Sequence, residues 1–442
     1  MALSGIQIYK LLPQTNCKEC GFPTCLAFAM KLAAKQVELS ACPYVSDESK
    51  AKLEESSAPP IRLITLKSDS YEVKAGNEVV MFRHEKTFYN KPGLFVKVKT
   101  SQKDDDIKNV AKRIQEYRVN YVGIDLEMDG IAVEDDANDP NRMKATLESI
   151  RSVCKKPVML FSNNVTALEA ALSQLNNEVP LLGCANSENW EKFVELGKKY
   201  KTALAVSSDN LDEMSELTEK IKDQGVEDIV LVPEGKNLGH ELILQTQIRR
   251  LALKANYRPL GYPTLSFCKT QAQMAQAIAK YAGFLVIDTF TEELVYPLLV
   301  LRQNIYTDPQ KPIQVQPGLY EINNPQPTDP VLVTTNFSIT YFSVANEVEG
   351  SGLPAYLLVA DAEGMSVLTA WAAGKFDAER IAKAVKTADL ESKVSKKRLV
   401  LPGAVAVLSG EVEAELPGWE IRVGPREAVD IPKFYKQVLQ VN

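Results

Sequence analysis

The chain has 442 residues, a length that corresponds to about three domains at the usual ~150 residues per domain. Apolar residues make up 45% and charged residues 24%, which is typical of an ordinary globular protein and excludes a disordered one. The 51 Lys and Arg residues are outnumbered by 57 Asp and Glu residues, and the resulting net charge of −6 argues against a general nucleic-acid binder. No apolar run approaches the roughly 18–20 residues of a membrane span. Residues 1–10 also lack a secretory signal, so we expect a cytoplasmic protein.

The first segment, residues 1–57, is short and rich in cysteine. Four of the seven cysteines lie there, and the polar run 47–60 that closes the segment reads as a linker. An odd number of cysteines in a cytosolic chain argues against a disulfide framework. The other three, Cys154, Cys184 and Cys268, are isolated, and we expect each to behave as a small buried hydrophobic residue.

The clustered cysteines follow a spacing that can wrap one metal centre. Cys17-x-x-Cys20 is followed by Cys25 and, after sixteen residues, by Cys42. Gly21 and Pro23 supply tight turns, and a helix over residues 26–39 is predicted to return the chain so that Cys42 closes the site. Four thiolates suit a [4Fe–4S] cluster or a structural zinc. Zinc ribbons usually show two paired Cys-x-x-Cys units, so the single pair favours iron–sulfur, with zinc or four unrelated buried thiols as alternatives.

The middle segment, residues 58–310, alternates strand-like and helix-like runs. Eight such units predict a (β/α)8 barrel, and a doubly wound open sheet is the alternative. Two runs before them, 61–66 and 78–82, are expected to form a hairpin that closes the bottom of the barrel. The eight expected barrel strands are 93–98, 121–126, 157–162, 180–185, 203–207, 229–233, 263–267 and 284–288.

Polar residues follow these expected strands, at the end where barrels build their active sites. Such a set could bind a pterin, or it could simply meet solvent or a partner. We do not expect a catalytic site here. The residues are Asp125, Glu127, Asp129, Asn163, Asn164, Asn186, Ser207, Ser208, Glu234 and Asp288.

The last segment is separated from the barrel by a proline-rich linker over residues 311–330. Six prolines lie between positions 309 and 330, which predicts an extended surface stretch at a domain boundary. Residues 331–442 are again α/β, and we expect a small doubly wound (Rossmann-like) domain of the kind that binds cofactors outside the carboxyl ends of its strands. Its expected strands are 331–334, 356–360, 397–401 and 420–423, and its expected helices are 340–348, 377–387 and 432–440.

The three-part order of a cysteine motif, a barrel and a C-terminal α/β domain resembles a known family over the whole chain. This family is the large (gamma) subunit of the corrinoid iron–sulfur protein of the reductive acetyl-CoA pathway, also called the gamma subunit of the acetyl-CoA decarbonylase/synthase complex. The resemblance implies a carrier of methyl groups rather than an independent enzyme. Its corrinoid cobalt would cycle between Co(I) and methyl-Co(III), and a [4Fe–4S] cluster on Cys17, Cys20, Cys25 and Cys42 would restore Co(I) after accidental oxidation.

The resemblance also implies partners. The corrinoid would lie between the C-terminal domain and a separate small subunit that forms a heterodimer with this chain. A methyltransferase would deliver the methyl group from methyltetrahydrofolate or a related pterin, and acetyl-CoA synthase, with its CO dehydrogenase partner, would receive it. A reductive activator is expected as well. Linkers at residues 47–60 and 307–330 would permit the domain motion that covers and uncovers the cofactor.

Small and polar residues in five loops of the C-terminal domain are the candidate corrinoid contacts. Small residues let the backbone approach a flat macrocycle, and backbone amides can bind its amide and phosphate groups. Ordinary turn chemistry is the alternative reading of each loop. The candidates are Thr340, Asn346, Gly352, Leu353, Ala370, Trp371, Ala372, Ala373, Gly374, Gly403, Ala404, Gly424, Arg426 and Ala428.

The chain contains very few histidines, and this limits the side chains that could ligate the cobalt. The only two, His84 and His240, lie outside residues 331–442, and neither forms the Asp-x-His-x-x-Gly motif of many corrinoid proteins. A corrinoid bound here should therefore have no histidine ligand from this chain, which would ease reduction to Co(I). Two other functions remain open. One is an iron–sulfur electron-transfer protein without corrinoid, and the other is a pterin-dependent barrel methyltransferase.

Overall fold

The computed structural model describes residues 5–33, 36–46, 48–50, 53, 59–307 and 312–440. Most of the expected linker 47–60 lies outside the described residues. The chain divides into two compact units, one formed by residues 1–118 and 127–306 and the other by residues 119–126 and 307–442. No helix in the described part of the chain is long and apolar enough to cross a membrane.

In its described part, the cysteine segment contains the short helices α1 (Gly5–Leu11) and α2 (Cys25–Ala33) and the 3₁₀ turn η1 (Leu39–Ala41), and residues 48–50 are helical as well. The predicted helix over residues 26–39 is therefore too long, since described residues 36–38 are no longer helical. Ile8 and Leu12 pack with Phe28 and Ala29 into one apolar cluster. This small core holds the segment together.

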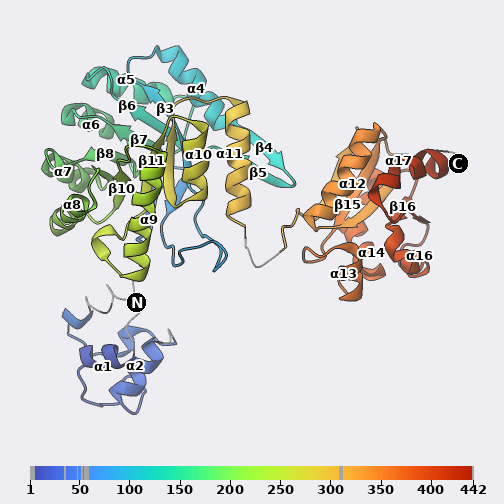
Figure 1. Cartoon of the computed structure of the whole chain (residues 1–442), viewed down its shortest axis with the longest axis horizontal. Helices are drawn as coiled ribbons and strands as arrows, with labels where there is room; N and C mark the ends of the chain where they lie inside the picture. Colours follow the sequence, from blue (N-terminus) through green and yellow to red (C-terminus); the bar gives the residue numbers. More distant parts are fainter. Residues whose placement is uncertain are drawn as a thin grey trace. The chain divides into compact units, whose positions relative to one another are not determined.

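The barrel prediction is confirmed. Eight parallel strands close in the order β10-β11-β12-β3-β6-β7-β8-β9 within the described residues, and helices surround them (Figure 1). The strands are β3 (Gly93–Lys99), β6 (Gly130–Glu134), β7 (Val158–Phe161), β8 (Leu181–Ala185), β9 (Ala203–Ser208), β10 (Ile229–Pro233), β11 (Thr264–Cys268) and β12 (Ala282–Ile287). The helices are α4 (Asp104–Glu116), α5 (Pro140–Arg151), α6 (Val165–Leu172), α7 (Trp190–Tyr200), α8 (Leu211–Asp223), α9 (Leu238–Lys254), α10 (Gln271–Ala279) and α11 (Glu292–Ile305), with the turn η2 (Arg258–Leu260).

A hairpin does precede the barrel, and it packs into the core of the barrel. Strands β1 (Ile64–Lys67) and β2 (Glu72–Ala75) pair antiparallel, and Ile64 and Leu66 join Phe95 and Phe284 in the core cluster of the barrel. The predicted second strand, 78–82, is wrong. Buried Glu78 in that stretch instead accepts a hydrogen bond from the backbone N–H of Tyr89, at 2.9 Å.

The second barrel strand was also placed wrongly. Residues 121–126 form parts of the two-stranded sheet β4 (Arg118–Tyr121) and β5 (Ile124–Glu127), and the barrel strand is β6. Val122 and Gly123 both have positive φ, at 45° and 82°, as a tight hairpin turn requires. A β-branched residue rarely adopts this conformation, so the sequence carried no turn signal there.

A buried arginine ties the amino end of β6 to the last barrel helix. Arg302 is 4% exposed, pairs with Asp129, and donates to the backbone oxygens of Pro92 at 2.9 Å and Glu127 at 3.0 Å. We expect Arg302→Met to destabilise the barrel by about 3–5 kcal/mol, because it leaves the Asp129 carboxylate without its cation. Urea unfolding of the barrel unit measures this, with Lys112→Met as the exposed control, expected to cost under about 1 kcal/mol. A loss as small as that of the control would contradict the prediction.

The second unit carries a five-stranded sheet, in the order β13-β15-β14-β16-β17 in the described residues. Its strands are β13 (Gly318–Ile322), β14 (Val331–Thr335), β15 (Ala355–Ala360), β16 (Arg398–Leu401) and β17 (Glu420–Val423). Four are parallel and β13 is antiparallel at the edge. All four predicted strands are present. The sequence had given residues 311–330 only as a linker, but 318–322 pair with β15, because the prolines flank this stretch and leave its N–H groups available.

Helices cover both faces of this sheet, so the unit is doubly wound. Leu332 and Val400 pack with α12 and α17 on one face, whereas Val333 and Leu399 pack with α14 and α16 on the other. The helices and turns are α12 (Ser338–Ser351), α13 (Val367–Ala372), α14 (Ala378–Thr387), α15 (Leu390–Lys393), η3 (Gly403–Leu408), α16 (Ser409–Glu415), η4 (Ala428–Asp430), α17 (Ile431–Phe434) and η5 (Tyr435–Leu439). The chain leaves β14 toward β15 and then crosses back to β16. The switch point between β14 and β16 is the position where such sheets bind ligands.

Candidate functional site

The four clustered cysteines are free thiols around one small core. Cys25, the first residue of α2, and Cys42, directly after η1, are buried in the apolar cluster of the cysteine segment. Cys20 is half-buried and packs against this cluster, whereas Cys17 is exposed. Three of the four predicted ligands therefore meet a common core.

Local contacts hold the two cysteine-bearing stretches. The loop before α2 turns sharply, with positive φ at Gln14, Asn16, Lys18 and Gly21. The hydroxyl of Tyr44 donates to the Glu19 carboxylate at 2.8 Å, which ties the stretch after Cys42 to the loop between Cys17 and Cys20.

The donor chemistry of this segment fits an iron–sulfur cluster, since four free thiols on one short segment are the ligands such a cluster takes. Their arrangement is more open than a ligated site. Across the described residues, no group of three or more cysteines, histidines, aspartates or glutamates lies close enough to hold a metal ion.

The second unit contains a large cleft at the switch point of its sheet. It has a volume of about 580 Å³ and is lined by the ends of β14 and β16, the first turns of α12, the start of α13 and the loop after β17. Buried apolar strand residues such as Leu332 and Val400 line it together with residues that carry hydroxyl and amide groups. Such a mostly apolar concavity with a few polar groups is typical of a cofactor site.

One polar group at the cleft has no partner in the protein. The Thr334 side chain lines the cleft and is 1% exposed, and its Oγ1 atom makes no hydrogen bond within the described structure. Buried hydroxyls are nearly always paired, so an unpaired one at a cleft is available to a ligand.

Two further residues shape the carboxyl edge of the sheet. Gly403 permits the loops after β16 and β17 to touch, because a Cβ atom there would lie 2.5 Å from the Gly424 carbonyl oxygen. Asn336 is 1% exposed, and its Oδ1 accepts from the N–H groups of Ala362 and Gly364, each at 2.9 Å. It thereby fixes the loop after β15 against the end of β14.

The cleft brings together part of the set proposed from the sequence. The residues that line it are Thr340, Asn346, Ala404, Gly424, Arg426 and Ala428. Gly403 lies directly behind them. Gly352 and Leu353 do not line it, because they end α12 and so lie at the opposite edge of the sheet. Ala370 is buried in the core, and exposed Trp371, Ala372, Ala373 and Gly374 lie beyond the cleft-lining start of α13.

Sequence reasoning missed several residues of the cleft. Ser343 and Glu347 lie on α12 at i+3 and i+7 from Thr340, so the helical spacing could have indicated them. No spacing pattern in the sequence could have indicated the exposed apolar side chains at the cleft. Ile339, Leu368 and Val429 are 66%, 54% and 67% exposed and come from three separate elements.

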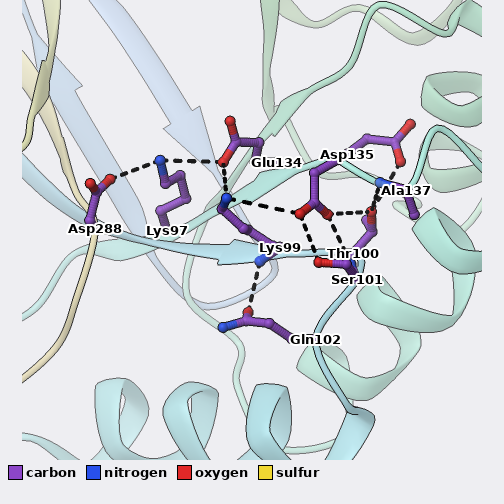
Figure 2. A network of polar contacts seen from close by, with 10 residues as sticks. Lys97, Lys99, Thr100, Ser101, Gln102, Glu134, Asp135, Ala137 and Asp288 are labelled. Carbon is purple, nitrogen blue, oxygen red and sulfur yellow. Dashed lines mark hydrogen bonds and ion pairs between the residues drawn. The ribbon is translucent and has the colours of Figure 1, made fainter.

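The mouth of the barrel is occupied by charged side chains that pair with one another (Figure 2). Lys97 of β3 lies between Asp288, at 2.8 Å, and Glu134, at 3.3 Å. Thr100 donates a hydrogen bond to Asp135, and Ser101 donates one to Asp136. Two members of the predicted polar rim therefore lie at the mouth of the barrel. They are Asp288 and Glu234, whose carboxylate accepts a hydrogen bond from the Ser207 hydroxyl.

Three members of that predicted rim are wrong. Asp125, Glu127 and Asp129 precede β6, and so they cannot lie at its carboxyl end. Glu127 pairs with Arg118 and Lys156, and Asp129 with Arg302. Asn164 and Asn186 serve local turns, since each side-chain oxygen accepts a backbone N–H directly downstream.

Lys97 and the three isolated cysteines of the barrel have pKa values that do not favour a nucleophile. Burial acts to lower the pKa of Lys97, but the hydrogen bond to Asp288 and the charge of Glu134 outweigh it and raise this pKa above its usual value. Burial raises the pKa of the Cys184 and Cys268 thiols to about 12 and also raises that of Cys154. Lys97 therefore stays protonated and the thiols stay neutral, so none is an active nucleophile.

We expect Lys97→Met to destabilise the barrel by about 1 kcal/mol. The pKa of Lys97 is raised in the folded state, so its contribution is complete below the ordinary lysine pKa of about 10.4 and is lost as pH rises through the folded value. Urea midpoints at pH 6 and pH 8 should therefore show the same difference from the unsubstituted protein. A difference that changes between the two pH values would contradict this prediction.

Comparison with known proteins identifies the family. A family model described as "CO dehydrogenase/acetyl-CoA synthase delta subunit" matches residues 64–435, and one described as "Putative Fe-S cluster" matches residues 12–44. The corrinoid/iron-sulfur protein large subunit of Moorella thermoacetica is 41% identical, covering 98% of this chain and 98% of its own. The chain belongs to the corrinoid/iron-sulfur protein large-subunit family.

Archaeal relatives extend the family over the full length of the chain. The gamma subunits of the acetyl-CoA decarbonylase/synthase complex of Methanopyrus kandleri and Methanothermobacter thermautotrophicus are each 34% identical, with 98% of this chain and 98% of theirs covered. The first family model names a delta subunit, but it begins after the cysteine segment, which these large and gamma subunits include. Among solved structures, a dihydropteroate synthase from Thermus thermophilus is 16% identical, with a TM-score of 0.37, 54% of this chain and 98% of its own covered.

Proposed function

We propose that this chain is the corrinoid- and cluster-bearing subunit of a methyl carrier of the reductive acetyl-CoA pathway. When bound, the corrinoid supplies a cobalt centre that in its Co(I) state accepts a methyl group from methyltetrahydrofolate, through a methyltransferase, and donates it to acetyl-CoA synthase. The chain itself then has two tasks. Its second unit binds the corrinoid, and its cysteine segment holds the [4Fe–4S] cluster that returns electrons to oxidised cobalt.

The cleft at the sheet switch point is the observation that carries this proposal. Its lining is mostly apolar, its volume of about 580 Å³ suits a large ligand, and the unpaired Thr334 hydroxyl offers a hydrogen bond. Thr340, Ser343 and Asn346 present further polar groups from one helix. No histidine belongs to this unit, so the chain offers no imidazole as a lower cobalt ligand.

The cysteine segment supports the second task. We propose Cys17, Cys20, Cys25 and Cys42 as the cluster ligands, with the buried pair fixed by the small core and the exposed loop closing over the iron. All seven cysteines are free thiols, which agrees with the reducing cytoplasm proposed for the protein.

A partner is needed because the cleft is open. The exposed apolar side chains of Ile339, Leu368 and Val429 lie around it, and large exposed apolar groups at a cleft indicate a further occupant. We propose the small subunit of a heterodimer as the protein that completes the site.

Metal analysis of the anaerobically purified heterodimer tests the proposal. We expect cobalt and iron together, with a visible spectrum that changes when a strong reductant forms Co(I). Iron without cobalt would favour the alternative, an iron–sulfur electron-transfer protein, and would refute the carrier.

A further inference from the structure

We propose that Asn16 is a positioning residue for the iron–sulfur cluster, and that it aims the Cys25 thiolate through two opposed hydrogen bonds. The backbone N–H of Asn16 donates to Cys25 Sγ at 3.4 Å, and the backbone N–H of Cys25 donates to Asn16 Oδ1 at 2.8 Å. The inference rests on the proposed ligand role of Cys25.

The backbone conformation of Asn16 selects its residue type. Asn16 has φ of 52°, in the left-handed region that asparagine tolerates better than most side chains. Glycine would also adopt this conformation but would lack the Oδ1 acceptor. Asparagine therefore combines the turn with the hydrogen bond that the Cys25 N–H requires.

The start of α2 explains why this N–H needs an outside partner. The first N–H groups of a helix have no acceptor within it. Thr24 Oγ1 accepts from Ala27 N at 3.1 Å, and Asn16 Oδ1 accepts from Cys25 N. Cys25 is only 5% exposed, so without Asn16 its N–H would be largely shielded from water.

These two hydrogen bonds, called here the Asn16–Cys25 clasp, distinguish Cys25 from the other proposed ligands. Its sulfur is held at the start of α2, where the backbone N–H of Asn16 donates to it. Cys42 is buried in the same core, but within the described structure only Cys25 is also held by hydrogen bonds to Asn16, whereas Cys17 is exposed.

The Asn16 N–H also acts on the redox couple. Hydrogen bonds to ligand sulfur help to set cluster potentials, because they offset the extra negative charge of the reduced form. Losing the Oδ1 anchor should loosen the loop and weaken the N–H···S bond. Reduction of the cluster should then become harder.

The test compares Asn16→Gly with Gln14→Gly in the complete heterodimer, by anaerobic potentiometric titration followed by electron paramagnetic resonance. Gln14 has φ of 56° in the same loop, and its side chain contacts Tyr9 rather than a cysteine. We expect Asn16→Gly to lower the equilibrium constant for reduction of the cluster about tenfold, which is about 59 mV for one electron. We expect Gln14→Gly to leave this constant unchanged.

Iron release to a chelator gives a second readout. Release should be faster in Asn16→Gly and return to the original rate in Asn16→Asp, which restores the acceptor oxygen. If Asn16→Gly binds no iron, recovery of iron in Asn16→Asp supports the inference and its absence there refutes it. Unchanged potential and release in an iron-loaded Asn16→Gly protein also refute it, while leaving the cluster proposal intact. Absence of iron from the unsubstituted protein would instead refute the cluster.

Discussion

Replacing Cys25 by alanine is expected to abolish the iron–sulfur cluster and with it the reactivation of oxidised cobalt. Cys25 is buried in the small core of the cysteine segment and begins α2, so no neighbouring thiol can take its place without unfolding the helix start. Iron and acid-labile sulfide per chain should fall roughly tenfold or more, because a four-cysteine cluster is rarely retained on three thiolates. Cobalt content and methyl transfer from chemically reduced protein should persist.

The matched control is Cys154→Ala in the barrel. Cys154 is also fully buried, and burial raises the pKa of its thiol, so it is expected to remain a neutral packing residue. Its loss should reduce stability but leave the iron content intact. Equal iron in the Cys25→Ala protein and the unsubstituted protein would show that the cluster is held elsewhere or absent.

Filling the cleft with a tryptophan at Ser343 is expected to eliminate corrinoid binding. Ser343 is an exposed helix residue that lines the cleft, and its hydroxyl donates only to the Ile339 carbonyl oxygen of its own helix. A large indole there should pack against the apolar side chains that line the cleft and occupy the space of the ligand, without disrupting α12. We expect cobalt per heterodimer to fall roughly tenfold or more while iron stays constant, since close packing leaves no room for both groups.

Glu349→Trp provides the control on the same helix. Glu349 is exposed on α12 and does not line the cleft, so the same bulky side chain should leave cobalt unchanged. Circular dichroism of both variants checks that the second unit is folded. Full cobalt loading in the Ser343→Trp protein would place the corrinoid outside this cleft.

The pattern of apolar residues along the chain was sufficient to predict most strands. Four strands of the five-stranded sheet in the second unit and seven of the eight barrel strands lie where apolar runs predicted them, because strands buried on both faces read as continuous Val, Ile and Leu segments. The exception in the barrel, β6, is a short run that begins with Gly130 and follows a more apolar stretch. That stretch is a hairpin belonging to the second unit, and its Val122 turn is invisible to residue preferences.

Site residues could likewise be predicted where they depend on local spacing, but not where they depend on the path of a loop or the order of the strands. Cysteine spacing is local, so the candidate ligands could be named directly, whereas the Asn16–Cys25 clasp spans a loop whose shape depends on four left-handed backbone positions. In the second unit, Thr340 and Asn346 were predicted from the start of a helix, but Gly352 and Leu353 were assigned to the wrong edge. Their loop follows α12 and precedes β15, so it lies at the amino ends of the parallel strands.

The amino-acid sequence alone determined the order of the three segments, the four clustered thiols and the near absence of histidine. These are properties of composition and short-range spacing, and folding does not change them. Only the tertiary structure decided that β14, β16 and β17 place Thr334, Ala404 and Gly424 around one cleft, and that Lys97, Glu134 and Asp288 neutralise one another at the barrel mouth. Such groupings depend on which strands become neighbours, and strand order is set by long-range packing that no local pattern encodes.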